Sequence, residues 1–164
     1  MKKMFLAALL VMISLGANAQ FEKGTKYANL SLTGLDMSYQ KGQKFHFGLE
    51  AKGGYFVVQD LMLGGVIGYD YQGGGSTHMF DLGANFRYYF HKSGVFVGGG
   101  LLYQHNGAGG VGTTNWFSVV PEAGYCFYIN RYLSIEPSVY CNICTNDFEN
   151  GSKFGLKLGF GFYF

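Results

Sequence analysis

Charged side chains recur along this 164-residue chain at alternating positions, where they could neutralise one another or line a path for ions. Acids in excess around a pore attract cations, whereas acids paired with bases form a network that satisfies buried charge. Either site requires these side chains to point to one side of their backbone segments. The candidates are five acids and three bases: Glu50, Asp70, Asp81, Glu122, Glu136, Lys52, Arg87 and Lys157.

Histidine and cysteine side chains suggest a second chemistry, that of a metal site. One Cys-x-x-Cys pair is half of a common zinc pattern, and histidines could add ligands. The chain has only three cysteines, so a second pair is missing and at least one thiol is unpaired. The candidate ligands are His46, His78, His105, Cys141 and Cys144. Because a second cysteine pair is missing, we predict no metal site and no cofactor.

A nucleophile beside a histidine and a carboxylate would indicate a hydrolase or an acyltransferase. Ser76, His78 and Asp81 are close in sequence, but His78 and Asp81 differ in parity. In a strand they would point to opposite faces. The glycine run 98–100 lacks the strand–loop–helix context of a phosphate loop. We predict that the chain is not an enzyme.

The elements that carry these residues are best seen in the last segment, 153–164, which reads KFGLKLGFGFYF. Successive side chains of a strand point to opposite faces. One face of this strand is therefore wholly apolar, and the other carries glycine, lysine and one tyrosine. This pattern is typical of a membrane-spanning β-strand whose apolar face meets lipid.

Eight segments of this kind follow one another, near the ~10-residue length of tilted membrane strands. All eight candidate charges fall on the inward parity, and a basic side chain facing lipid would cost about 2–4 kcal/mol. A soluble β-sandwich is the alternative, with the same charges on its surface. The predicted strands are 26–36, 45–57, 61–71, 78–90, 95–104, 116–128, 133–141 and 153–164.

The first residues are predicted to be a secretory signal peptide, which together with the terminal Phe164 and the high aromatic content favours the membrane alternative. Lys2 and Lys3 precede an uncharged apolar run over 5–15, and Ala17-Asn18-Ala19 supplies a small-x-small cleavage site. The run is shorter than the ~20 residues of a spanning helix, so a retained anchor is the less favoured alternative. We predict residues 1–19 as a cleaved signal peptide and 20–164 as one barrel domain.

The charge of the predicted mature chain excludes nucleic acid as a partner. The 12 basic and 10 acidic residues of the whole chain become 10 and 10 once Lys2 and Lys3 are removed, so the net charge is zero. A nucleic-acid-binding protein would need a basic patch or tail.

The connections between predicted strands alternate between short and long. The short ones are 58–60, 91–94 and 130–132, and most of the others are longer. Short periplasmic turns and longer outer loops are typical of outer-membrane barrels, so both mature termini are predicted to be periplasmic. Aromatic girdles are predicted at the two membrane interfaces. Their members are Tyr55, Tyr88, Tyr89, Tyr125, Tyr128 and Tyr132 on the periplasmic side, and Tyr69, Tyr71, Tyr103, Trp116 and Tyr140 on the outer side.

Two prolines conflict with this pattern, because Pro121 and Pro137 fall inside the sixth and seventh predicted strands. Each removes a hydrogen bond from a ladder that has no free edge in a closed barrel. We predict a bulge or kink there, shared between the two strands because they are neighbours.

The whole mature chain resembles the small outer-membrane β-barrel family, of the OmpX and OmpA-barrel type. The resemblance rests on the signal peptide, the alternating strands, the segments 120–125 and 135–139, and the terminal aromatic residues. It implies an all-β, eight-stranded, antiparallel, up-and-down transmembrane barrel in the bacterial outer membrane, in contact with lipid and lipopolysaccharide. It also implies assembly by periplasmic chaperones and the barrel-assembly machinery, with a C-terminal assembly signal at Phe160, Phe162 and Phe164.

The function predicted from these features is a structural or surface-interaction role in the cell envelope. Side chains just fill the interior of an eight-stranded barrel, which favours a paired charge network over an ion path. A narrow, porin-like channel for small solutes or ions is the alternative, because the inward acids outnumber the inward bases. A lipid-modifying outer-membrane enzyme is the third and least favoured possibility.

Overall fold

The computed structural model describes residues 21–33, 46–72, 77–90, 93–108, 111–145 and 153–164. Nine strands run through these ranges, and each pairs antiparallel with its neighbours. Within the same ranges, no helix is both long enough and apolar enough to cross a membrane. The strands are β1 (Lys26–Thr33), β2 (His46–Val58), β3 (Leu61–Gln72), β4 (Thr77–Tyr89), β5 (Val95–Ala108), β6 (Val111–Tyr125), β7 (Phe127–Asn130), β8 (Leu133–Cys144) and β9 (Lys153–Tyr163).

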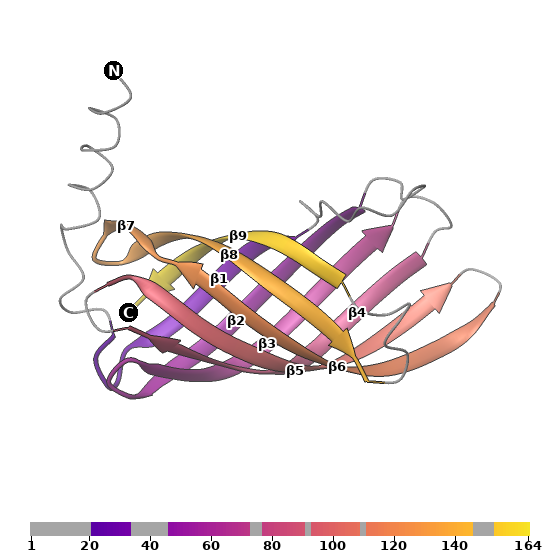
Figure 1. Ribbon diagram of the computed structural model, residues 1–164, viewed down its shortest axis with the longest axis horizontal. Helices are drawn as coiled ribbons and strands as arrows, with labels where there is room; N and C mark the ends of the chain where they lie inside the picture. The colour runs from indigo at the N-terminus through magenta and orange to yellow at the C-terminus, as the bar shows by residue number, and fades with distance from the viewer. Residues whose placement is uncertain (1–20, 34–45, 73–76, 91–92, 109–110, 146–152) are drawn as a thin grey trace, which may run out of the picture.

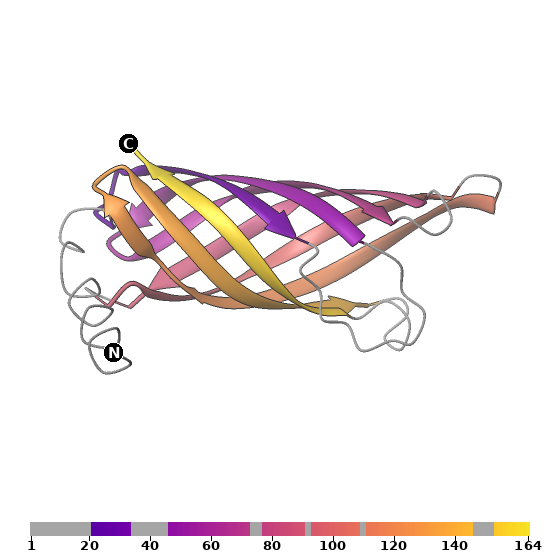
Figure 2. The ribbon, with the colours of Figure 1, turned by 90° about the horizontal axis from the view of Figure 1, so that it is seen from above.

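The strands close into a barrel (Figures 1 and 2). Each strand from β1 to β6 pairs with the next, β8 pairs with β9, and β1 pairs with β9. The short strand β7 continues the line of β6, and both pair with β8. Counting β6 and β7 as one wall strand, the predicted antiparallel, up-and-down barrel of eight strands is confirmed.

The sixth predicted strand differs from the observed one. It is interrupted at Cys126, whose backbone N–H donates to the carbonyl of Gly94 at 2.8 Å. It also begins at Val111, where it pairs with Ala108 of β5. The segment 105–115, expected to be a loop, is therefore mostly a paired hairpin. Its residues are mostly polar or glycine and show no alternation of apolar and polar side chains. A strand that does not face lipid does not require that alternation.

Side-chain parity is as predicted along the described strands. Outward apolar side chains such as Leu101 are exposed, whereas the polar side chains of Asn29, Ser31 and Gln104 are buried inside. Tyr89, Tyr128 and Tyr140 of the predicted girdles lie on the interior side instead: Tyr89 is fully buried, Tyr128 packs partly buried against the interior cluster, and the Tyr140 ring lies 4.7 Å from the ammonium of Lys157. Tyr89 lies between the outward residues Tyr88 and Phe90, so its parity directs it inward.

The two prolines interrupt the same seam of the wall. Between β6 and β8 the paired residues skip Pro121 and its opposite Cys141, and the pairing stops again between Gly124 and Phe127, opposite Pro137. Pro121 keeps its pairing with β5, and Pro137 keeps its pairing with β9. The predicted shared irregularity is present as missing bridges, but the predicted bulge is not, since register shifts on this seam begin only after Tyr128.

Both ends of the described chain meet at the short-turn end of the barrel. Lys26 and Phe164 exchange two backbone hydrogen bonds of 2.9 and 3.0 Å. Asp60, in the turn between β2 and β3, donates its backbone N–H to the carbonyl of Phe21 at 2.9 Å. Asp60 has a positive φ of 65°, which a short aspartate side chain tolerates in a tight turn.

Gly64 and Gly53, on the adjacent strands β3 and β2, give a matched test of wall packing. A Cβ on Gly64 would collide with the carbonyl of Gly53 and lie 2.7 Å from the Cα of Gly54, whereas a Cβ on Gly53 meets no atom within 4 Å. Because the obstacle is backbone, Gly64→Ala is expected to destabilise the barrel by about 1–3 kcal/mol. Gly53→Ala should have little effect. Equal urea midpoints for the two refolded variants would contradict this packing.

Candidate functional site

The barrel interior holds a network of ion pairs at mid-height. The ammonium of Lys52 lies 2.7 Å from a carboxylate oxygen of Glu122 and 3.4 Å from one of Glu50. The ammonium of Lys157 donates to both oxygens of Glu50, at 2.7 and 2.8 Å, and lies 4.0 Å from Glu122. These groups are contributed by β2, β6 and β9, so the network joins strands on different sides of the wall.

Arg87 of β4 extends this network toward the short-turn end. Its Nε donates to Oε1 of Glu122 at 2.5 Å, and its Nη1 donates to Oε2 of Glu136 at 2.7 Å. Its side chain is 1 % exposed, and its guanidinium carbon lies 4.3 Å from the centre of the Phe96 ring. The planar fork of arginine suits two carboxylates at once, in a way that a lysine ammonium does not.

Glu136 of β8 collects the largest number of donors. One oxygen accepts from the Tyr27 hydroxyl at 2.5 Å and from the Asn29 amide at 3.2 Å. The other accepts from the hydroxyls of Ser134 and Tyr163 at 2.6 and 2.9 Å. A fully buried carboxylate with this many donors and one cation has its hydrogen-bonding capacity satisfied.

Six of the eight predicted site residues belong to this network, and their charges balance. They are three acids and three bases: Glu50, Glu122, Glu136, Lys52, Arg87 and Lys157. The two inward acids in excess of the inward bases are the remaining residues, Asp70 and Asp81, which lie in a separate group.

Asp70 and Asp81 face the interior on the side of the network away from the short turns. Asp81 accepts from the amide of Gln104 at 3.0 Å, and Gln104 accepts in turn from Ser118 at 2.6 Å. Asp70 accepts from the hydroxyl of Thr33 at 3.3 Å. Both carboxylates line a cavity of about 40 Å³ whose other walls include Glu50 and Lys157.

An aromatic cluster fills the interior at the short-turn end. The Phe21 and Tyr89 rings stack with centres 4.2 Å apart, and Phe56 lies 5.7 Å from Phe21 and 5.4 Å from Tyr89. This cluster was not predicted from the sequence, although inward parity near the ends of strands was the signal that could have revealed it. Its buried members are Phe21, Tyr27, Phe56, Met62, Tyr89, Phe96, Cys126 and Tyr163.

The metal and catalytic candidates are not brought together among the described residues. His78 is exposed and lies 2.6 Å from the hydroxyl of Tyr69, whereas Asp81 is buried inside. His105 contacts Asn115 across the β5–β6 hairpin at 2.7 Å. Within the described ranges, no three His, Cys, Asp or Glu side chains are placed to hold a metal ion.

The remaining candidates of this kind are the cysteines, Ser76 and His46. Cys126, Cys141 and Cys144 are free thiols, and Cys126 lies in the aromatic cluster. Ser76 is outside the described residues, and the side chain of His46 is not described.

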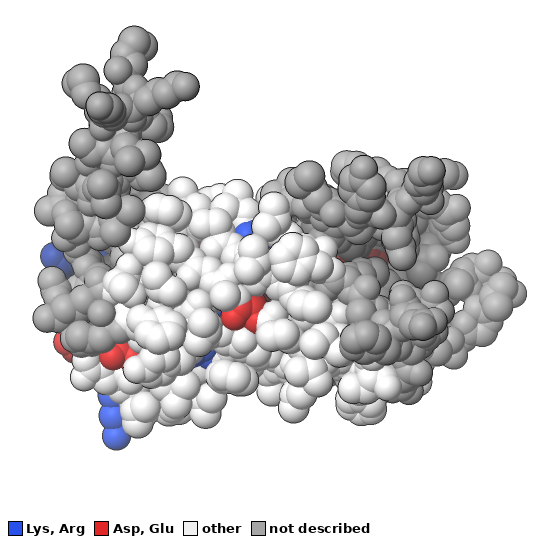
Figure 3. Space-filling model, viewed as in Figure 1, with Lys and Arg blue, Asp and Glu red and all other residues white. Residues whose placement is uncertain are grey.

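The outer surface of the barrel wall is apolar, whereas the interior is charged. Figure 3 shows one face, on which the side chains between the two ends of the barrel are mostly uncharged. Large apolar side chains stand exposed on every long strand, and Phe117, Phe154 and Leu101 are more than 60 % exposed. Apolar outside and charged inside is the arrangement of a barrel that lies in lipid.

Among known proteins, only solved structures match this chain, and they support the fold. No protein-family model and no curated protein sequence matches the chain. The outer membrane protein Ail of Yersinia pestis has a similar structure, with a TM-score of 0.60 and 17% identity over 87% of this chain and 100% of that one.

Two further solved structures are similar over almost the same part of the chain. The N-terminal β-barrel domain of Pseudomonas aeruginosa OprF gives a TM-score of 0.62 at 18% identity, covering 87% of this chain and 98% of that one. Neisserial surface protein A gives 0.63 at 14% identity, covering 85% and 96%. The chain therefore has the eight-stranded transmembrane β-barrel fold of the small outer-membrane proteins of the OmpX and OmpA-barrel type.

Proposed function

We propose that this protein is an integral outer-membrane barrel with a closed interior, and that its role in the cell envelope is structural or one of surface interaction. The observation that carries the proposal is the charge-balanced network of Glu50, Lys52, Arg87, Glu122, Glu136 and Lys157 across the interior. Paired buried charges hold each other in place, so a permeating ion would have to break them. The aromatic cluster, which fills the interior between the network and the short-turn end, supports the same conclusion.

The proposed orientation places both mature termini in the periplasm. Its support is the short turn at Gln59–Asp60, which lies at the same end as Phe21 and Phe164. Short turns are periplasmic in barrels of this kind. The apolar outer surface would then contact outer-membrane lipid and lipopolysaccharide. We propose no nucleic-acid partner and no enzymatic activity.

The β5–β6 hairpin is the element best suited to contacts outside the membrane. It extends beyond the other strands at the end opposite the C-terminal residue Phe164 (Figure 1). Bonding on the β8 side begins only at Phe117, whose carbonyl accepts from Thr145, so among the described strands the segment 111–116 of β6 pairs with β5 alone. Ail, which has this fold, is by name an attachment invasion locus protein. A surface-interaction role for the present chain is consistent with both observations.

Single-channel recording tests the closed interior. Residues 20–164, refolded and inserted in a planar bilayer, are expected to produce no conductance steps, while a porin recorded in the same bilayer confirms detection. A heat-dependent gel shift verifies that the silent sample is folded. Cation-selective steps that disappear in Glu50→Gln would instead establish the narrow channel. A change in the lipid A mass spectrum on deletion of the gene would establish the enzyme.

Phe164→Ser is expected to lower the amount of heat-modifiable barrel in the outer membrane without changing the stability of the refolded protein. The Phe164 ring is 68 % exposed, and its backbone bonds to Lys26 survive the substitution. The proposed loss is in recognition by the assembly machinery and periplasmic chaperones. Phe154→Ser is the control, since Phe154 is 62 % exposed at the other end of β9. Normal membrane levels of Phe164→Ser would contradict a terminal assembly signal.

A further inference from the structure

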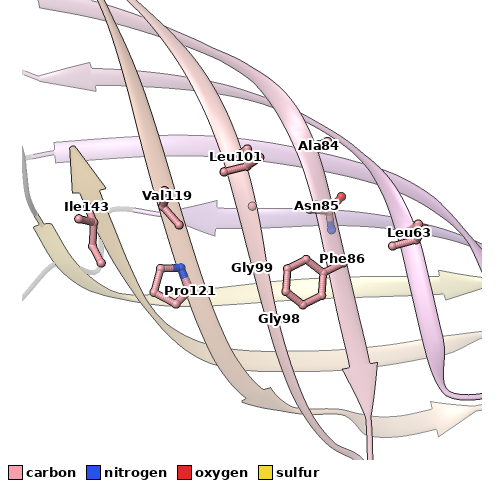
Figure 4. Close-up of a pocket in the computed structure, with 11 residues that line it drawn as sticks. Leu63, Ala84, Asn85, Phe86, Gly98, Gly99, Leu101, Val119, Pro121 and Ile143 are labelled. Atoms are coloured by element: carbon pink, nitrogen blue, oxygen red, sulfur yellow. The ribbon is translucent and has the colours of Figure 1, made fainter. Parts of the chain in front are cut away.

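The outer face of the barrel carries a groove that the proposed closed interior does not explain. It crosses the face of β3, β4, β5 and β6, reaches Ile143 of β8, and has a volume of about 500 Å³ (Figure 4). This volume lies within the range of about 300–1,000 Å³ found for small-molecule sites. Its outward walls are Leu63, Phe86, Leu101, Val119, Pro121 and Ile143.

The floor of the groove is made by the glycine run of β5. Gly98 has no room for a side chain, because a Cβ there would lie 2.5 Å from the carbonyl oxygen of Phe86 and 2.9 Å from Cγ of Arg87. Gly99 is on the outward parity, between the large residues Val97 and Leu101. A Cβ on Gly99 would approach the Phe86 ring at 3.1 Å and otherwise point into the groove. Gly99 therefore leaves space on the outer surface where its neighbours on β5 place apolar side chains.

The groove also borders the interrupted seam. Gly99 pairs with Pro121, and Pro121 faces Cys141 across the missing bridge between β6 and β8. The neighbouring bridge from Val119 to Ile143 is present, so the far wall of the groove is held by β8. The polar side chain nearest the floor, Asn85, can direct its amide to the carbonyls of Gly64 and Gly65 at 3.3 Å. The lining thus presents an apolar surface to a ligand.

We propose that this groove binds one acyl chain of a membrane lipid, with the chain lying over Gly99 between Phe86 and Pro121. The groove is continuous with the exposed apolar wall. Its occupant is therefore drawn from the same membrane lipid that covers the rest of that wall. A chain in the groove contacts the protein on its floor and both sides, whereas lipid over the convex wall contacts it on one side. The proposal rests on the proposed placement in a membrane.

Photo-crosslinking tests the site. The refolded full mature chain is placed in phosphatidylcholine vesicles in which a fraction of the lipid carries a diazirine in one acyl chain, and labelled residues are found by peptide mass spectrometry. We expect label to be enriched at Phe86, Leu101 and Pro121 relative to exposed outward residues that line no groove, such as Ile67 and Leu30. Even labelling of all outward residues would overturn the proposal.

A substitution that fills the groove provides the second arm. In Gly99→Leu the new side chain displaces about two methylene groups of the lipid chain, for which we expect about a tenfold fall in the enrichment. Val97→Leu, on the same outward parity of β5 and outside the groove lining, should leave the enrichment unchanged. Unchanged labelling in Gly99→Leu would overturn the proposal.

Two further measurements separate the possible failures. If Gly99→Leu does not show the heat-dependent gel shift, Leu101→Ala replaces it; this variant shortens one wall and should weaken the enrichment at Phe86 and Pro121. Protein–protein crosslinks centred on the groove would identify a second copy of the chain as the occupant and overturn the lipid assignment. Absence of label from every outward residue would instead contradict the membrane placement.

Discussion

Arg87→Met is expected to lower the free energy of unfolding by about 3–5 kcal/mol, the usual cost of removing one partner from a buried ion pair. Arg87 is 1 % exposed and binds Glu122 and Glu136 directly. After the substitution Glu122 retains Lys52 at 2.7 Å, but in the described ion pairs Glu136 has no other cation. The carboxylate of Glu136 would then be buried without a countercharge. Urea unfolding of the refolded protein in lipid vesicles measures the loss.

Two variants make the Arg87 result specific. Arg131→Met removes the same kind of side chain from the exposed turn between β7 and β8, where it lies over the Tyr132 ring, and should change stability little. Adding Glu136→Gln to Arg87→Met should recover part of the loss, because the uncompensated carboxylate is then removed. If Arg87→Met is as stable as Arg131→Met, the ion network contributes nothing to the barrel.

Phe56→Ala is expected to lower the free energy of unfolding by about 3–5 kcal/mol, as for other buried phenylalanines, independently of the ion network. Phe56 is fully buried, and its ring contacts those of Phe21, Tyr89 and Tyr163 in the aromatic cluster. Truncation leaves a cavity inside the barrel that the surrounding wall strands cannot collapse to fill. The same urea titration measures it.

The matched control for Phe56 is Phe80→Ala, whose ring faces outward and is 48 % exposed. Its loss removes contacts with lipid and leaves no internal cavity, so the stability change should be clearly smaller. Equal losses in the two variants would show that the aromatic cluster has no special stabilising role. Single-channel recording of Phe56→Ala also tests the closed interior, since the intact ion network should keep this variant silent.

Much of the wall was predictable from the sequence because strand parity is a local property. The alternation in 153–164 predicted β9 and its lipid-facing side, and the burial of Lys157 agrees with the inward side assigned to it. Burial of Arg87, Glu122 and Glu136 follows from the same rule, since a charge facing lipid is costly wherever the strand lies. None of these predictions required knowledge of the neighbouring strand.

Features that depend on neighbouring strands were predicted less well. The strand break at Cys126 lies where pairing with β8 is missing between Gly124 and Phe127, opposite Pro137, a residue of another strand. The long β5–β6 hairpin is stabilised by pairing of the two strands with each other and is hidden by its polar composition. Phe56, Tyr89 and Tyr163 each have inward parity, but only closure of the barrel brings their ends together as one cluster.

The sequence by itself determined the class of fold and which side of the wall each charge faces, because a period of two and the cost of charge in lipid act on every strand separately. Only the tertiary structure decided which charges pair. Arg87 meets Glu136 and Lys157 meets Glu50 across 49 and 107 residues of chain, and such meetings depend on the stagger and tilt of the closed barrel. The same closure separated the balanced network from Asp70 and Asp81, although the sequence presents all eight charges as one set.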